Sequence, residues 1–175
     1  MPRLLIPAIL ACGLALTARP ASAQSATAPI ATHSRYAAGL VAGVSQFDLS
    51  GTGTTALFGA RVEAELQRWL VVEGALESFR PEEQFGLNSR YTIPEVQLQV
   101  QYPGRVVRPY LGVGGGYVLA SDGREKQGTG SGALGFRVAP RNAPVAVLAE
   151  LRVRGIGKSF GGSAAEWTIG LVHRF

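Results

Sequence analysis

Glycines recur through residues 108–117, RPYLGVGGGY, in a composition that could cradle a phosphate. A phosphate-binding loop must lead into the N-terminus of a helix, where free backbone N–H groups hold the anion, and in a P-loop a Lys-Ser/Thr pair follows. Residues 118–123, VLASDG, follow instead and are typical of a strand that ends in a turn. The segment therefore predicts a strand whose glycines serve packing.

Two histidines, His33 and His173, are the candidates for general-base chemistry. Acyl transfer or lipid hydrolysis would need one of them within hydrogen-bond reach of a serine and an acid. Neither has a serine at a spacing that indicates such a set, and His33 has no Asp, Glu, Cys or second His nearby to complete a metal site. We therefore expect no catalytic, cofactor-binding or metal-binding residues, and no enzyme.

The N-terminal residues predict an export signal. Arg3 supplies a positive start, residues 4–18 form an apolar core, and Ala21-Ser22-Ala23 fits the small-x-small cleavage pattern. We predict a signal peptide over residues 1–23, removed at about Ala23.

An alternative interpretation takes residues 9–12, ILAC, as a lipoprotein box with Cys12 as the lipid anchor. The roughly eight residues before that cut are far fewer than the usual 15 or more. Cys12 is the only cysteine, so the mature chain has neither disulfides nor thiolate metal ligands. Residues 24–34 are small, polar and interrupted by proline, and predict a flexible periplasmic leader.

Charge excludes one class of partner. The whole chain carries 17 Lys plus Arg against 12 Asp plus Glu, a formal net charge of +5. A nucleic-acid-binding protein would cluster its positive charge, whereas here acids and bases alternate along the same segments. We interpret this pattern as internal pairing and expect no nucleic-acid partner.

From Arg35 onward the sequence alternates with period two, which sends successive side chains to opposite faces of a strand. One face of each segment is apolar or large, and the other carries charged, amide or small residues. Eight strands are predicted, at residues 36–44, 58–67, 70–77, 94–102, 110–119, 133–138, 147–154 and 166–175.

The predicted connections alternate in character. Short ones are expected at residues 68–69, 102–108 and 140–144, and longer or more polar ones at 50–54, 80–89, 121–130 and 155–162. An even strand number with alternating turns is typical of an up-and-down membrane barrel, whose strands need only about 9–11 residues to cross the bilayer. We predict an all-β fold, an eight-stranded antiparallel up-and-down transmembrane β-barrel, over residues 35–175.

Period two alone does not say which face is inside, because a membrane barrel reverses the arrangement of a soluble one. Aromatic residues near strand ends, where an interfacial girdle would need them, favour the reversed arrangement; they are Tyr36, Trp69, Tyr102, Tyr110, Trp167 and Phe175. The last residue, Phe175, also stands on the apolar face of its strand. The charged face is also balanced, and its cations are all arginine, which suits enclosed ion pairs. This face consists of Arg61, Arg137, Arg152, Arg154 and Arg174 with Glu63, Glu65, Glu73, Glu77, Glu95, Glu150 and Glu166.

The interior of an eight-stranded barrel is only wide enough for side chains to fill. We therefore expect a plug of ion pairs and glutamines, in which Glu77 and Arg154 take part, with no aqueous pore. Inward glycines of segments 36–44 and 110–119 are expected to make room for the long arginines. Pro94 removes a ladder donor, and we expect a bulge there. A soluble sandwich remains the alternative explanation of the glycines.

Two segments carry a resemblance to a known family. Residues 91–95 (YTIPE), 101–104 (QYPG) and 108–117 resemble the paired central strands of the bacterial outer-membrane β-barrels, the small opacity- and OmpA-like proteins. The final residues 167–175, WTIGLVHRF, are similar to the C-terminal strand signature of that family, although His173 stands where a large apolar or aromatic residue is more usual. The resemblance implies the outer membrane of a Gram-negative bacterium, contact with its lipids, and recognition by the barrel-assembly machinery through the strand that ends at Phe175.

The whole-chain pattern and the charges of the predicted loops lead us to expect a structural or surface-interaction role through extracellular loops; the sequence identifies no surface ligand. Charged residues in the predicted loops are Arg80, Glu82, Glu83, Arg90, Arg124, Glu125, Lys126 and Lys158. The alternatives are a barrel-hosted lipid-modifying enzyme, a small gated channel, and a secreted soluble β-barrel carrier.

Overall fold

The computed structural model describes residues 35–47, 53–80, 90–121, 126–140, 143–157 and 162–175. The predicted signal peptide and leader lie outside these residues, as does most of the loop predicted over residues 80–89. No helix in the described part of the chain is long and apolar enough to cross a membrane.

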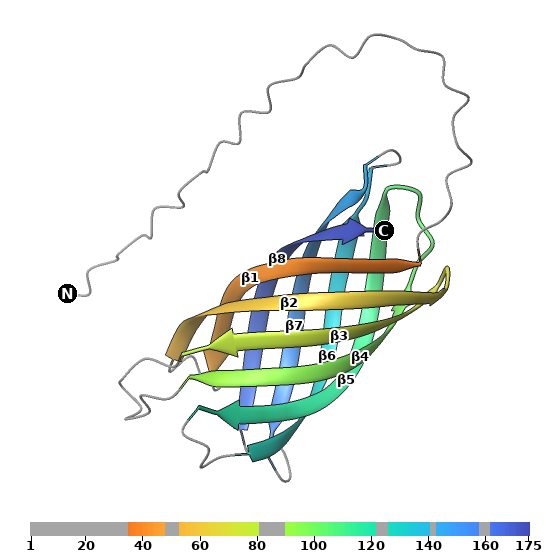
Figure 1. The fold of residues 1–175 in the computed structure, drawn as a ribbon. Coiled ribbons are helices and arrows are strands. Elements are labelled where there is room, and N and C mark those ends of the chain that lie inside the picture. The colour runs from red at the N-terminus through yellow and green to blue at the C-terminus, as the bar shows by residue number, and fades with distance from the viewer. Residues whose placement is uncertain (1–34, 48–52, 81–89, 122–125, 141–142, 158–161) are drawn as a thin grey trace, which may run out of the picture. The chain divides into compact units, whose positions relative to one another are not determined.

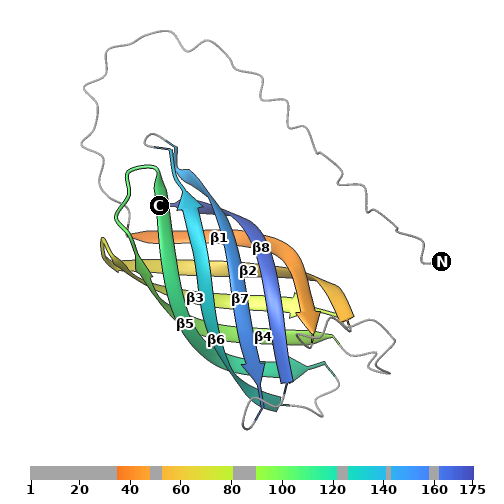
Figure 2. The same cartoon turned by 180° about the vertical axis from the view of Figure 1, so that it is seen from behind.

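Eight antiparallel strands close into a single barrel, in which each strand pairs with the next and β1 pairs with β8 (Figures 1 and 2). The predicted fold class is confirmed. The strands are β1 (Tyr36–Phe47), β2 (Gly53–Gln67), β3 (Leu70–Phe79), β4 (Tyr91–Gln101), β5 (Val107–Ala120), β6 (Lys126–Val138), β7 (Val145–Ile156) and β8 (Gly162–Arg174).

Several strands extend further than predicted into segments that were expected to be loops. β6 begins at Lys126, although a loop was predicted through Gly130, and β2 begins at Gly53 within a predicted turn. These extensions contain glycine, serine and threonine, so they lack the apolar alternation that marks a strand in the sequence. Their backbone ladders continue nevertheless, because Lys126 is in register with Leu119 and Gly53 with Phe47.

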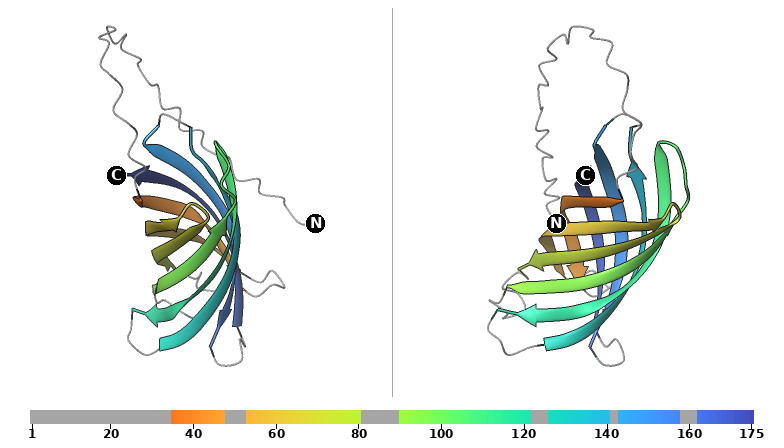
Figure 3. Two further views of the ribbon diagram at one scale, coloured as in Figure 1. Left: turned by 90° about the vertical axis from the view of Figure 1, so that its right-hand side faces the viewer. Right: turned by 45° about the vertical axis from the view of Figure 1, so that its right-hand side comes forward.

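The barrel has two distinct ends, between which the strands tilt and coil (Figure 3). We call one the terminus end; it carries Tyr36, Phe175 and the connections at residues 68–69, 102–106 and 139–144. The other, the loop end, carries the connections at 48–52, 80–90, 121–125 and 157–161. Only residues 80–90 form a longer connection than those of the terminus end. For the other three connections the prediction is therefore wrong in length, because the strands take up part of each predicted loop, while the sequences that remain there are polar and glycine-containing.

The two faces of the strands are segregated as predicted. Outward side chains are apolar and exposed, as at Leu40 (71%) and Ile169 (66%), whereas the inward Arg61 and Glu73 are 1% and 0% exposed. The middle of the interior is thus charged and the exterior apolar, the reverse of a soluble barrel.

The expected bulge at Pro94 is wrong. Pro94 is in register with Leu76 of β3, and the β4–β5 ladder keeps one register on both sides of the proline, from Thr92↔Leu119 to Glu95↔Gly116. Loss of the proline N–H interrupts this ladder locally without shifting the strand. A register shift occurs instead between Glu65 and Gln67, next to the turn into β3.

Candidate functional site

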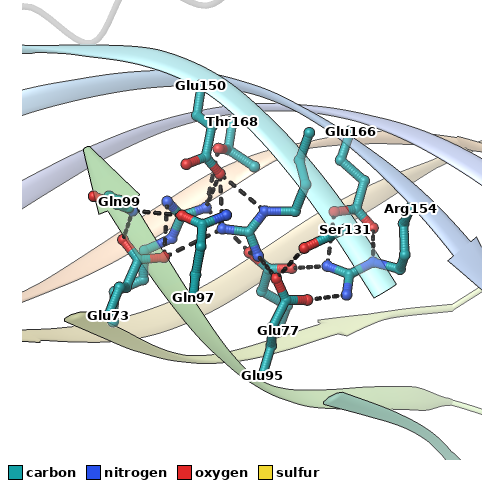
Figure 4. Close-up of polar contacts among 12 residues, drawn as sticks. Glu73, Glu77, Glu95, Gln97, Gln99, Ser131, Glu150, Arg154, Glu166 and Thr168 are labelled. Carbon is teal, nitrogen blue, oxygen red and sulfur yellow. Dashed lines mark hydrogen bonds and ion pairs between the residues drawn. The ribbon is translucent and has the colours of Figure 1, made fainter. Parts of the chain in front are cut away.

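Ion pairs fill the middle of the lumen and form what we call the central network. Strand alternation places its members on inward positions of β2, β3, β4, β7 and β8, so that side chains from opposite walls meet (Figure 4). The network consists of Arg61, Arg152 and Arg154 with Glu73, Glu77, Glu95, Glu150 and Glu166. The predicted interior pairing of Glu77 with Arg154 belongs to it, with 2.9 Å between Arg154 Nη2 and Glu77 Oε2.

Arg152 contacts four of the five glutamates. Its guanidinium nitrogens lie 2.8 Å from Glu150 Oε1, 3.1 Å from Glu95 Oε1, 3.2 Å from Glu73 Oε1 and 3.3 Å from Glu77 Oε1. One cation therefore joins β3, β4 and β7. A planar fork with five donors makes such multiple pairing possible, which explains why arginine rather than lysine occupies the position.

Arg61 and Arg154 extend the network toward the other strands. Arg154 donates from Nε to Glu166 Oε1 at 3.0 Å and also pairs with Glu95, and Arg61 Nη2 lies 2.9 Å from Glu150 Oε1. Neutral polar groups add further hydrogen bonds: Gln99 donates to Glu73 Oε2 at 3.0 Å, and Ser131 donates at 2.6 Å to Glu95 Oε1, which also accepts from Arg152. A buried charge is tolerated only with such pairing and hydrogen bonding.

A second polar layer lies between the central network and the terminus end. Arg137 of β6 donates at 2.9 Å both to Gln101 Oε1 and to Glu63 Oε1, and its guanidinium carbon lies 4.7 Å from the centre of the Tyr110 ring. Tyr110 is 2% exposed and donates its hydroxyl to Glu150 at 2.7 Å. The prediction that Tyr110 belongs to an interfacial aromatic girdle is therefore wrong, because it stands on an inward position of β5.

Of the other aromatic residues expected in the girdle, all are exposed on the outside of the barrel. Trp167 nevertheless lies near the middle of β8, in register with Val44 and Leu151, rather than near a strand end. The girdle prediction is confirmed in its outward direction for Tyr36, Trp69, Tyr102 and Phe175, and is wrong in position for Trp167.

Apolar side chains pack together inside the barrel on the loop-end side of the central network, an arrangement that the sequence pattern did not predict. We call this cluster the apolar cap; it consists of Leu57, Phe79, Tyr91, Ile93, Val118 and Ala120, with Ile156 packed against it. The rings of Phe79 and Tyr91 stack with centroids 5.7 Å apart. Each member stands on the same strand face as the buried charges, so inward parity, rather than polarity, was the signal that could have identified them.

The inward glycines of β5 make room for neighbours, but not for arginines. A Cβ at Gly114 would lie 2.6 Å from Glu95 Oε1 and 2.8 Å from Ser131 Oγ, and one at Gly112 would lie 2.7 Å from Gln97 Cδ. On β1, Gly39 and Gly43 lie against the backbone of β8 instead. The prediction that inward glycines make room for neighbouring atoms is thus confirmed, but those atoms belong to glutamate, glutamine and backbone rather than to arginine.

His173 points outward, as predicted, and its ring lies 5.3 Å from that of Phe175. Among the described residues no serine or carboxylate is hydrogen-bonded to its ring, and no group of His, Cys, Asp or Glu there is arranged to hold a metal ion. His33 lies outside the described residues. The geometry assembled in the described part of the chain is that of a plugged membrane-type barrel.

Comparison with known proteins supports this class through structure alone. The sequence matches no protein-family model and no curated protein. The structure is similar to Neisserial surface protein A, NspA, with a TM-score of 0.69 and 14% identity over 81% of this chain and 98% of that chain. It is also similar to Ail, the attachment invasion locus protein of Yersinia pestis, with a TM-score of 0.54 and 15% identity over 81% of this chain and 99% of that one.

A third similar structure is the outer-membrane enzyme PagL, with a TM-score of 0.53 and 11% identity over 78% of this chain and 99% of that chain. At such identities the likeness is one of fold. The chain has the eight-stranded fold of bacterial outer-membrane barrels, as the resemblance in sequence implied. Because the group contains an enzyme as well as surface proteins, the fold by itself does not define an activity.

Proposed function

We propose that the chain is a small outer-membrane protein of the Gram-negative cell envelope, with a structural or surface-interaction role and no enzymatic activity. The observation that supports this most directly is the reversed polarity of the barrel, with exposed apolar side chains outside and buried ion pairs inside. An apolar exterior suits contact with lipid, and a closed strand ladder leaves no edge strand with unpaired backbone N–H and C=O groups. In this orientation the terminus end faces the periplasm and the loop end faces the outside of the cell.

The surface-interaction part of the proposal concerns the connection at residues 80–90. It is the longest connection of the loop end and contains Arg80, Glu82, Glu83 and Arg90. Residues 124, 125 and 158 offer further charges in shorter connections, whereas Lys126 belongs to β6 and lies 4.9 Å from the ring centre of Tyr117. Binding residues are often carried by loops on a rigid scaffold. NspA is described as a surface protein, and Ail has been solved with a heparin analogue, sucrose octasulfate.

Two partners follow from the proposed location. Outer-membrane lipids would contact the apolar exterior, and the barrel-assembly machinery would recognise the C-terminal strand that ends at Phe175. Replacement of Phe175 by serine should then reduce the yield of folded barrel in cells while leaving refolding in detergent unchanged. Equal yields of folded barrel in cells for Phe175→Ser and the unaltered chain would contradict recognition by the assembly machinery through Phe175.

Membrane fractionation combined with gel migration tests the location and the closed fold together. Unheated, detergent-extracted protein should come from the outer-membrane fraction and migrate differently from heated protein. A mature chain that is monodisperse and folded in plain buffer would instead indicate a soluble carrier. For the interaction role, deletion of residues 81–89 should abolish a binding phenotype that the intact cells show, and an unchanged phenotype would leave only a structural role.

A small channel and a lipid-modifying enzyme are the functions to be distinguished from this proposal. The apolar cap and the central network both argue for a closed lumen, so planar-bilayer recordings should show no steady large conductance. The enzyme alternative depends on His173, which lacks a hydrogen-bonded serine or carboxylate in the described part of the chain. Lipid hydrolysis that is lost in His173→Ala would overturn the non-enzymatic proposal.

A further inference from the structure

Arginines converge around a shallow cup inside the terminus end of the barrel. The cup is open at its mouth and encloses about 20 Å³, room for about one water-sized group. Its wall includes Arg35, Arg108, Arg137, Arg174, Glu63 and Glu65. Buried Ala37 and Val71 also line it, so the cup lies within the ring of strands rather than on the outer face. Four cations therefore face two carboxylates in one small space.

The pairing of these charges is incomplete. Arg137 pairs with Glu63 at 2.9 Å, and Arg108 lies 3.8 Å from Glu65. The guanidiniums of Arg35 and Arg174 make no ion pair or hydrogen bond with any residue that the structure describes. Arg137, which is 3% exposed, also has a buried Nε without a hydrogen-bond partner among those residues.

The strand register brings like charges directly together. Arg108 of β5 and Arg137 of β6 are cross-strand partners. Farther round the ring, Arg174 of β8 is in register with Ala37, which is itself in register with Glu63. Like charges on directly opposed positions destabilise a sheet. The surplus acids of the central network do not compensate this arrangement by contact, because the ion pairs of those glutamates are made with Arg61, Arg152 and Arg154.

We propose that this cup is a binding site for a soluble oxyanion, a phosphate or carboxylate group. Guanidiniums bind both groups through paired, charge-assisted hydrogen bonds, and an anion between the four arginines would remove their mutual repulsion. The ligand is soluble rather than a lipid headgroup because the cup is lined by inward residues such as Ala37, Val71 and Arg137, which lie behind the wall of strands. Only the origin of the ligand rests on the proposed function. If the terminus end faces the periplasm, the ligand is a periplasmic solute or a group carried on a larger periplasmic molecule.

Binding is tested with the mature chain in nanodiscs of phosphatidylcholine, with pyrophosphate and citrate as the phosphate and carboxylate probes. NMR of the arginine Nε–H groups should show saturable shifts at Arg174 and Arg137 that equimolar chloride does not produce. Arg174→Gln should weaken binding of the probe at least ten-fold. Arg68→Gln is the matched control, because Arg68 is exposed at the same end but does not line the cup.

Three results would overturn the proposal. The first is the absence of saturable shifts with either probe in a barrel whose gel migration shows that it is folded. The second is an equal loss in Arg68→Gln, which would indicate diffuse attraction by surface charge. The third is a result in discs of phosphatidylglycerol: the Arg174 Nε–H signal shifts without any probe, and pyrophosphate no longer binds. The occupant of the cup would then be a lipid headgroup. Because all the measurements use purified protein, they are independent of the cellular location in the proposed function.

Discussion

Arg154 and Glu77 form an ion pair across the full width of the lumen, with 2.9 Å between Nη2 and Oε2. Arg154 belongs to β7 and Glu77 to β3, strands that stand four places apart in the closed ring of eight and are 77 residues apart at this contact. The pair thus connects opposite walls that share no backbone hydrogen bonds. The strand number and the stagger of the ladders set the diameter of the barrel, and cross-lumen pairs of this kind add contacts between walls that the ladders do not join.

Replacement of Arg154 by methionine should destabilise the barrel by about 3–5 kcal/mol, because removal of one partner leaves buried charges uncompensated. Glu77, Glu95 and Glu166 would all lose a partner. Reversible urea unfolding in detergent or lipid vesicles measures the loss. The double variant Arg154→Met/Glu166→Gln should recover part of it. A loss below about 1 kcal/mol for the single variant would show that the network contributes little to stability.

The second prediction concerns the unequal numbers of acids and bases in the central network, which contains three arginines and five glutamates. Glu73→Gln should change the free energy of unfolding by less than about 1 kcal/mol, because it removes repulsion among surplus carboxylates while the amide oxygen still accepts from Gln99. Arg152→Gln should be destabilising by several times that amount, because Arg152 contacts four glutamates. The same unfolding assay compares the two, and equal losses would contradict the inferred excess of acid.

Period-two alternation was sufficient to predict the strand number, the fold class and the polarity of the two faces, because a closed barrel imposes one direction on each side chain. It failed where both faces are small or polar, as in residues 126–132 of β6, since the ladder continues there without any hydrophobic signal. Tyr110 illustrates a related failure. Its aromatic type predicts a position in the interfacial girdle, whereas its parity on β5 sends it inward.

The contacts of the interior could not be predicted in the same way. Which arginine meets which glutamate depends on the stagger between strands and on rotamers that span the lumen, as the contact of Arg152 with Glu95 illustrates. The sequence predicted the members of the central network correctly because polarity and parity agree for them. It missed the apolar cap, where inward residues such as Leu57 and Ile93 are apolar and parity is the only signal.

A third prediction tests the packing of the interior at Gly114. Gly114→Ala should destabilise the barrel by about 1–3 kcal/mol, because its Cβ would enter the space of Glu95 and Ser131 and the core must shift. Gly132→Ala of β6 is the control, since a Cβ there meets no atom within 4 Å. The difference between the two in urea unfolding is the informative quantity. Equal effects would indicate that glycine at position 114 reflects strand propensity rather than space.

The fourth prediction tests whether the apolar exterior faces lipid. Leu40 is 71% exposed near the middle of β1, and Leu66 is 56% exposed close to the turn into β3. In lipid vesicles Leu40→Arg should be destabilising by about 2–4 kcal/mol, because a charge near the bilayer midplane must leave water, whereas Leu66→Arg near the interface should cost about 0–1 kcal/mol. Urea unfolding in vesicles of one defined lipid measures both. Both positions are on the outer face and receive the same charge, so a difference in the loss of unfolding free energy reports depth in the bilayer. Small and equal losses at the two positions would mean that this face does not contact the hydrocarbon core.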